Sequence, residues 1–142
     1  MIGVDANALV ALAAETHPSH SRAATVFERE LATDEEIILS VSVAAEFLHA
    51  VTDPRRLAPA LEMTKAIRWL REWSIEVAPT WLNLTEEAVE RWLNWMTELQ
   101  LGRKRILDTQ YAALLHAHGV RRILTNNADD FRVFNVFEIV MF

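Results

Sequence analysis

The sequence predicts a three-layer α/β/α fold, in which a short-stranded, mostly parallel central sheet of four to five strands lies between helices. Short apolar runs alternate with longer segments of helical periodicity along the whole chain, a pattern typical of parallel sheets. The length of 142 residues suits one domain with one core. No repeat, low-complexity tract or linker is visible, so residues 1–142 are expected to form a single domain.

The first strand and the first two helices are predicted from a short apolar run and from helix signals. The apolar run at 1–4 leads through Asp5 into a helix, which Pro18 interrupts. Ser19 can cap the second helix, because a serine oxygen accepts hydrogen bonds from the free backbone amides of the first turn. The apolar residues of this helix have helical spacing at Ala23, Phe27 and Leu31.

A second strand and two further helices are expected next. Residues 37–39 form a continuous apolar run suited to a buried parallel strand. Ser40 or Ser42 starts the following helix, which ends near Pro54 because the residue before a proline disfavours helix. A proline suits the first turn of a helix, so the next helix is expected over 59–73.

A third strand and a long helix are expected after residue 73. Residues 74–78 contain two apolar residues in alternation and predict a short strand. Asn83 or Thr85 can cap the helix that follows, and Gly102 closes it.

The last part of the chain is expected to supply one helix and two strands. The helix at 107–118 ends at Gly119, where a left-handed conformation is expected. A strand at 122–125, a polar turn at 126–129 and a final strand at 136–141 complete the predicted fold.

Composition restricts the classes of function. The chain has no cysteine, which excludes disulfides and thiolate zinc sites. No apolar run reaches the roughly 18 residues that a membrane span needs, so a cytoplasmic protein without a membrane partner is expected. The net charge of −6 argues against nucleic-acid binding driven by overall charge. It leaves room for a nucleic-acid enzyme, since bound cations can reverse the potential of an acidic site.

Acidic residues are expected to meet at the carboxyl edge of the sheet, where α/β proteins bind ligands. Asp5 directly follows the first strand, and the polar segment 126–130 follows the fourth. Helices that begin at the same edge can deliver Glu46 and Asp108. A divalent ion, Mg²⁺ or Mn²⁺, relieves repulsion among such carboxylates and activates water for phosphodiester hydrolysis.

Each of these residues also has a purely structural interpretation, which the sequence leaves open. Asp5 and Asp108 lie near helix starts, where aspartate is a favoured cap. Glu46 shares a helical stripe with other polar residues, as on the solvated face of an amphipathic helix. Asn127 and Asp130 belong to a predicted turn, where both residue types are common for conformational reasons.

Four motifs occur in order around these residues: Ile2-Gly3-Val4-Asp5-Ala6-Asn7-Ala8-Leu9, Ser42-Val43-Ala44-Ala45-Glu46-Phe47, Ile106-Leu107-Asp108-Thr109-Gln110-Tyr111-Ala112-Ala113 and Leu124-Thr125-Asn126-Asn127-Ala128-Asp129-Asp130-Phe131. In content and separation they resemble the motifs of PIN-domain ribonucleases, specifically the VapC toxins of prokaryotic toxin–antitoxin modules. The resemblance extends over essentially the whole chain. It implies a Mg²⁺-dependent endoribonuclease, with Mn²⁺ as the alternative ion, that hydrolyses RNA by metal-activated water. It also implies that Asp5, Glu46 and Asp108 are the core catalytic and metal-binding acids.

The last motif is expected to complete the implied site. Asn127 and Asp130 match the family there, so both are expected at the metal and Asp130 also in catalysis, with Asp129 as the neighbouring competitor. Many relatives have a hydroxyl residue two positions after the first acid. Asn7 stands there in this chain, and its amide can still orient a metal-bound water. Thr125 is expected to hold a water or a phosphate.

The resemblance further implies a homodimer that is inhibited by a VapB-like antitoxin. The antitoxin is expected to lay a helix on an apolar groove and to insert a basic side chain near the acids. Trp69 and Trp73, four residues apart on one helix, are candidates for this groove, and core packing is their alternative interpretation.

Other interpretations remain beside the nuclease. A PIN-like domain that binds RNA or protein without cleaving it is the main alternative. A phosphoryl-transfer domain is disfavoured, because Asn7 stands where such phosphatases usually have a second acid. Basic residues cluster at 55–56 and at 103–105, and the second cluster immediately precedes Asp108, where it can guide an RNA backbone or simply form a solvated loop.

Overall fold

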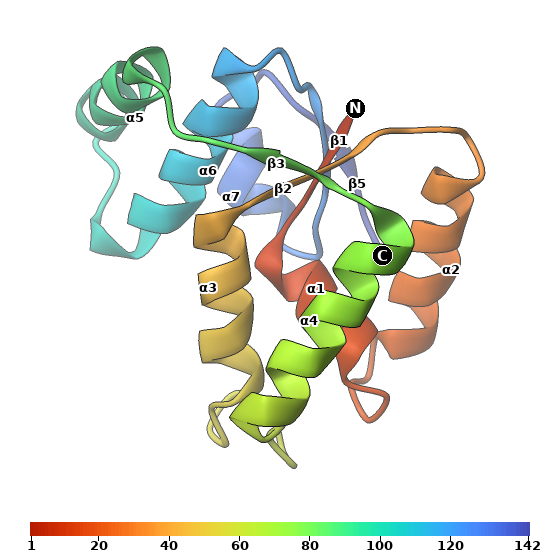
Figure 1. Ribbon diagram of the computed structural model, residues 1–142. Helices are drawn as coiled ribbons and strands as arrows, with labels where there is room; N and C mark the ends of the chain where they lie inside the picture. Colours follow the sequence, from red (N-terminus) through yellow and green to blue (C-terminus); the bar gives the residue numbers. More distant parts are fainter.

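Five strands form the single sheet of the computed structural model, which describes residues 1–142 (Figure 1). Their spatial order is β3-β2-β1-β4-β5, and every neighbouring pair is parallel. The strands are short: β1 (Ile2–Val4), β2 (Ile37–Ser40), β3 (Thr80–Leu82), β4 (Arg122–Leu124) and β5 (Glu138–Val140). The predicted short-stranded parallel sheet is therefore confirmed.

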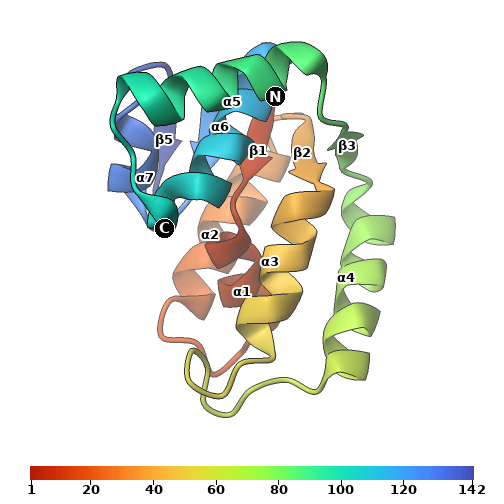
Figure 2. The ribbon, with the colours of Figure 1, turned by 90° about the vertical axis from the view of Figure 1, so that its left-hand side faces the viewer.

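Helices cover both faces of this sheet. They are α1 (Ala6–Ala13), α2 (His20–Leu31), α3 (Val41–Val51), α4 (Met63–Val77), α5 (Glu86–Glu98), the 3-10 turn η1 (Arg103–Arg105), α6 (Ile106–Ala117) and α7 (Ala128–Arg132). Figure 1 shows α5, α6 and α7 on one side of the strands and α1, α2 and α4 on the other. In Figure 2, α3 runs beside α1 and faces α4, which it contacts. The predicted three-layer arrangement is confirmed. None of the helices combines the length and the apolar character needed to cross a membrane.

The central strand β1 packs unusually closely against α6. A Cβ atom added at Gly3 would lie 2.7 Å from a methyl carbon of Leu115 and 3.0 Å from the hydroxyl of Tyr111. Glycine therefore allows α6 to approach the backbone of β1 directly. This contact positions α6, which carries Asp108, over the carboxyl end of the central strand.

Capping side chains start three of the helices near their predicted boundaries. Asp5 precedes α1, and its carboxylate accepts a hydrogen bond from the Ala6 amide. Ser40 is the cap of α3, because its hydroxyl accepts from the Val43 amide at 3.3 Å. Thr85 caps α5 in the same way. Of the alternatives that the sequence left open, Ser40 and Thr85 are therefore the capping residues.

The third strand was predicted in the wrong place. Residues 74–78 continue α4, and the strand that pairs with β2 is Thr80–Leu82. The alternation of Ile75 and Val77 is misleading, because Ile75 is 81% exposed and contributes nothing to a buried face. Helix α4 ends where Ala78 adopts a left-handed conformation with φ 49°, directly before a proline.

Four further elements differ from the prediction. Helix α4 begins at Met63 and not at Pro59, because the preceding segment folds back on α3 through a 2.9 Å hydrogen bond from the Leu61 amide to the Val51 carbonyl. Helix α5 ends at Glu98, before Gly102. The predicted polar turn at 126–129 runs into the short helix α7, and the last strand is confined to Glu138–Val140.

Candidate active site

The carboxyl ends of β1 and β4 meet at the point where the connections diverge. From β1 the chain proceeds to β2 on one side, whereas β4 lies on the other side and leads to β5. Such a switch point leaves a crevice between the loops, and open α/β sheets bind ligands there. Asp5 follows β1 directly, and its amide donates to the Leu124 carbonyl of β4 at 3.0 Å. The first predicted acid therefore stands at this switch point.

Asp5 is held by three hydrogen bonds and is only 7% exposed. The Ala6 amide donates to Oδ1 at 2.7 Å. The Asn7 side-chain amide and the Thr125 hydroxyl both donate to Oδ2, at 2.6 and 2.7 Å. These contacts fix the rotamer of the carboxylate. Asp5 is thus a helix cap as well as a member of the cluster described next.

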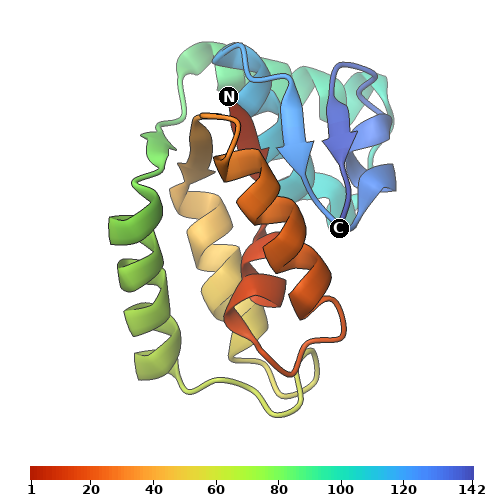
Figure 3. The same cartoon turned by 90° about the vertical axis from the view of Figure 1, so that its right-hand side faces the viewer.

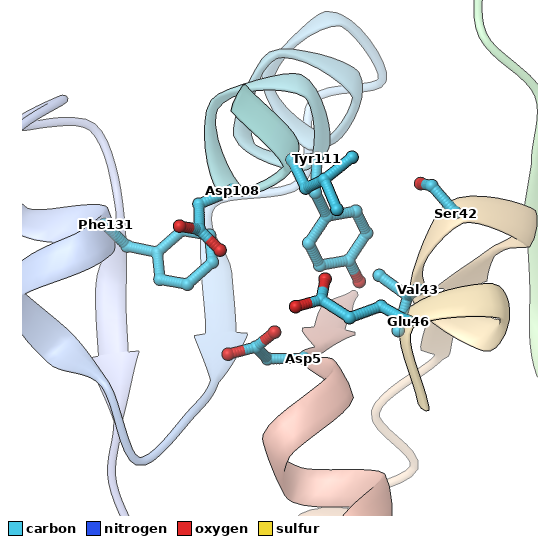
Figure 4. Close-up of a pocket in the computed structure, with 8 residues that line it drawn as sticks. Asp5, Ser42, Val43, Glu46, Asp108, Tyr111 and Phe131 are labelled. Atoms are coloured by element: carbon cyan, nitrogen blue, oxygen red, sulfur yellow. The ribbon is translucent and has the colours of Figure 1, made fainter. Parts of the chain in front are cut away.

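Asp5, Glu46 and Asp108 line one small pocket, although they come from the β1–α1 junction, α3 and α6. Figure 4 shows their carboxylates directed toward a common space, with the rings of Tyr111 and Phe131 beside it. The cavity has a volume of about 10 Å³. This is close to the minimum that one water molecule occupies, so the pocket suits an ion or a water and excludes a nucleotide.

Burial and mutual repulsion disfavour ionisation of this cluster. Burial raises the pKa of Asp5 to about 7, and the charges of Glu46 and Asp108 add to the effect, while the Thr125 hydrogen bond opposes it. Burial, then the charges of Asp130 and Glu46, raises the pKa of Asp108 to about 6. The pKa of Glu46 is also raised, mainly by burial. Bound positive charge would relieve this penalty.

The donor set fits a hard divalent cation in its chemistry. The groups that face the pocket are carboxylate oxygens, with the hydroxyl oxygen of Ser42 nearby. In their present positions, however, no three of the His, Asp and Glu side chains lie close enough to hold one ion together. Because Mg²⁺ keeps several waters and needs only one or two carboxylates, an open cluster of this kind remains compatible with it.

The three candidates for the fourth corner lie in different surroundings. Asp130 is close enough for its charge to raise the pKa of Asp108, but its carboxylate pairs with Arg105 at 2.7 Å. The Asn127 side-chain amide donates to the same carboxylate. The side chain of Asp129 is 90% exposed and pairs with Arg132 on the surface of α7. Asp130 therefore belongs to the edge of the cluster, whereas Asp129 does not.

Asn7 and Thr125 are already engaged with protein groups. The Thr125 hydroxyl is fully buried, donates to Asp5, and accepts from the Asn127 amide at 2.9 Å. Asn7 donates to Asp5, and its side-chain oxygen accepts from the Asn126 amide at 3.1 Å. Both side chains thus orient the first acid and tie β1 to the loop after β4. This arrangement differs from the expected contact of Thr125 with water or phosphate.

Two residues of the site were not predicted. Tyr111 lines the pocket one helical turn after Asp108, and its buried hydroxyl donates to the Val4 carbonyl at 3.0 Å. The three-residue spacing of Asp108 and Tyr111 on one helix could have predicted that both side chains lie on the same face. Arg105 was predicted only as part of a basic cluster. Its guanidinium turns inward, pairs with Asp130 and opposes the rise in the pKa of Asp108, and no local pattern distinguishes it from its exposed neighbours.

Comparisons with known proteins agree with the fold. The family model of the PIN domain matches residues 2–135. The structure is similar to VapBC2 from Rickettsia felis bound to a DNA fragment from their promoter, with a TM-score of 0.72, 17% identity, and coverage of 100% of this chain and 99% of that chain. It is also similar to VapBC-1 from nontypeable Haemophilus influenzae, with a TM-score of 0.71, 15% identity, and coverage of 99% and 98%.

A third similar structure is VapC20 from Mycobacterium tuberculosis, a Sarcin-Ricin loop cleaving toxin, with a TM-score of 0.61, 17% identity, and 87% of each chain covered. At these identities the likeness concerns the fold. No curated protein matches the sequence. The family model covers nearly the whole chain, and the chain therefore belongs to the PIN-domain family.

Proposed function

We propose that this PIN-domain protein is a Mg²⁺-dependent endoribonuclease that acts as the toxin of a VapBC-type toxin–antitoxin module. One observation carries the proposal: Asp5, Glu46 and Asp108 converge on one ion-sized pocket at the switch point of the sheet. Capping explains only Asp5, and a solvated helix face does not explain why Glu46 points into a pocket. The family and the VapC-like fold agree with a nuclease.

Some side chains of the site would bind the metal ion, and others would orient the residues that bind it. Mg²⁺, when bound, makes a water more acidic and neutralises charge that develops on phosphate oxygens. Asp5 would be the rigid ligand, since three hydrogen bonds hold it. Glu46 of α3 and Asp108 of α6 would hold the ion from the other sides of the pocket. Tyr111 and Phe131 limit the space in which the acids can move.

Cleavage of a single-stranded RNA with Mg²⁺ and with EDTA tests this proposal. Asp5→Asn and Asp108→Asn should each lower the cleavage rate at least about 100-fold, because even the outer partners of metal ligands contribute about 10–100-fold. Asp129→Asn is the matched control and should retain activity, since its carboxylate lies outside the cluster. Unchanged cleavage in both variants of the acids would rule out the catalytic proposal.

A groove between α2 and α4 is the candidate site for a VapB-like antitoxin. It has a volume of about 290 Å³, and apolar side chains form most of its lining. Both predicted tryptophans line the groove. Trp73 is buried against Phe27 and also belongs to the core, whereas Trp69 is half-buried. Two of the similar structures are VapBC complexes, which supports this kind of partner.

The antitoxin proposal can be tested with the product of a small reading frame beside the gene. Leu31→Glu places a charge in the groove and should weaken complex formation at least about tenfold, because a buried unpaired charge is strongly unfavourable. Ile75→Glu, at an exposed position of α4 outside the groove, is the control. Equal affinities of the two variants would place the partner elsewhere.

A second apolar region supports the proposed homodimer. Val41 is 68% exposed and Leu84 is 43% exposed, and both line a groove of about 320 Å³. Ser42 lines this groove and also the acidic pocket, so a second copy seated here would bring two active sites together. Light scattering should show a dimer that Leu84→Glu dissociates and Ile75→Glu does not.

The alternative is a PIN domain that binds RNA or protein without cleaving it. The spacing of the acids favours this non-catalytic function, because no three of them can hold an ion in their present positions. The pairing of Asp130 with Arg105 also favours it, because that carboxylate is already engaged. RNA binding without cleavage in Mg²⁺ or Mn²⁺ would support this alternative.

A further inference from the structure

A second cavity adjoins the acidic pocket and shares a wall with it. Glu46 lines both cavities, and the second one has a volume of about 170 Å³. It lies between α1 and α3, whose far ends carry the loops with His17 and Arg56. Figures 2 and 3 show these two loops side by side at the end of the molecule remote from the sheet. The cavity therefore leads from the acids along the groove between two helices.

The floor of this cavity is apolar. Val10 of α1, Ala50 of α3 and Phe142 at the carboxyl end of the chain contribute to it. The volume is several times the roughly 30 Å³ of a water molecule but below the roughly 300 Å³ at which pockets for drug-sized ligands begin. A single planar group of moderate size fits such a space better than an ion or a long side chain does.

The rim carries polar groups that remain available for a ligand. Arg56 forms no ion pair, whereas its neighbour Arg55 is bound to Asp53 at 3.1 Å. His17 accepts from the Ser19 amide through Nδ1, which leaves Nε2 available. The Asn126 side chain also lines the cavity and makes no hydrogen bond within the protein. One free guanidinium, one ring and one amide thus surround an apolar floor.

We infer that this cavity binds one nucleotide of the RNA substrate, next to the bond that is cleaved, and this inference rests on the proposed nuclease function. The guanidinium of Arg56 binds the phosphate of that nucleotide, and its base lies on the apolar floor. The ring of His17 can stack on the base, and the side-chain amide of Asn126 can form hydrogen bonds with its edge. Proteins use both kinds of contact to bind unpaired nucleotides. Since Glu46 separates the two cavities, a strand whose scissile phosphate lies at the acids presents its neighbouring nucleotide here.

One arginine of an adjacent pair is thereby expected to contact RNA, and the other is not. Arg55 and Arg56 carry the same charge in the same loop, but only Arg56 lines the cavity. Arg56→Ala should weaken binding of a labelled single-stranded RNA about tenfold, because it removes a charged hydrogen bond. The plot of log affinity against log salt should become shallower by about 0.7, as expected for one lost phosphate contact. Arg55→Ala should leave both quantities unchanged.

A second variant tests the floor without altering charge. Ala50→Phe fills part of the cavity from α3 and should weaken RNA binding while leaving the salt dependence intact. Binding is measured by fluorescence anisotropy in the Asp108→Asn background, so that cleavage does not interfere. Thermal unfolding of each variant checks that the fold is retained. In the wild-type background, Arg56→Ala should raise KM, and Arg55→Ala should not.

The possible failures are distinguishable. If the wild type cleaves RNA but Arg56→Ala and Arg55→Ala bind and cleave alike, the nucleotide site is wrong and the proposed function stands. If Arg56→Ala affects only the complex with an antitoxin protein, the inference is likewise overturned. If the wild type neither cleaves nor binds RNA, the proposed function fails and the inference fails with it.

Discussion

Ionisation of Asp5 should destabilise the metal-free protein as the pH rises. The pKa of Asp5 is raised from 3.8 to about 7, first by burial and then by the neighbouring acids. When the pKa of an acid is higher in the folded than in the unfolded state, the contribution of that acid to stability is fully present at a pH below the pKa of the unfolded state. The contribution is lost as the pH rises through the pKa of the folded state. A shift of about three units at about 1.36 kcal/mol each amounts to about 4 kcal/mol.

Asp5→Asn removes the titrating group and should remove this pH dependence. Of the about 4 kcal/mol, about 2–3 kcal/mol falls between pH 5 and pH 8, because the group in the unfolded chain is already largely ionised at pH 5. Urea unfolding in EDTA at pH 5 and at pH 8 measures this change in the free energy of unfolding. Wild-type stability should fall by about 2–3 kcal/mol more than that of Asp5→Asn, and the variant should be the more resistant of the two to alkaline conditions.

Comparison of two pH values separates ionisation from packing. The side-chain amide that Asp5→Asn introduces alters the hydrogen bonds with Asn7 and Thr125, but this change is the same at both pH values and cancels in the difference. Asp129→Asn changes an exposed ion pair and serves as the control for a general charge effect. Equal falls in stability for the wild type and Asp5→Asn would refute the assignment of this penalty to Asp5.

Three further predictions follow from the same geometry. Mg²⁺ at about 100 times its Kd should stabilise the wild type at pH 8 by about 2.7 kcal/mol; calorimetry should show no such gain for Asp108→Asn. Thr125→Val leaves the Asn127 amide without its acceptor and removes one of the three hydrogen bonds to Asp5, so it should cost about 1–3 kcal/mol in urea unfolding, which Thr125→Ser should largely restore. Gly3→Ala should cost about 1–3 kcal/mol, because the added carbon meets Leu115 at 2.7 Å; a neutral substitution would contradict the close packing of α6 on β1.

The parts of the fold that sequence predicts well are those set by local physics. Ser40 and Thr85 start helices because their hydroxyls satisfy free amides, and Gly119 has φ 75° where a left-handed cap was expected. The short apolar runs of β1 and β2 are fully buried on both faces, as parallel strands are. In these elements local preference and tertiary packing agree.

The wrong predictions concern segments whose secondary structure depends on tertiary contacts. Segment 74–78 alternates in hydrophobicity like a strand, but helix α4 continues through it to Val77, whose side chain packs against the core. The strand at 80–82 has only three residues and is largely exposed, since it lies at the edge of the sheet. Its only determinant is pairing with β2, which no local pattern reveals.

The same division applies to the site. The acids could be proposed from their places after strands and on helices, because parallel topology gathers such positions at one edge. The hydrogen bond from Thr125 to Asp5 joins residues 120 positions apart and depends on the neighbouring register of β1 and β4. The inward turn of Arg105 toward Asp130 likewise depends on the packing of α6 against α7.

The energetic cost of Asp5 distinguishes a capping role from a functional one. Asparagine caps a helix about as well as aspartate and has no ionisable proton, so capping alone does not require a carboxylate here. A penalty of about 4 kcal/mol is a large share of the roughly 5–15 kcal/mol by which domains are stable. The penalty arises from the burial of Asp5, and the charges of Glu46 and Asp108 add to it. Under the proposed function, a bound Mg²⁺ would turn this repulsion into attraction.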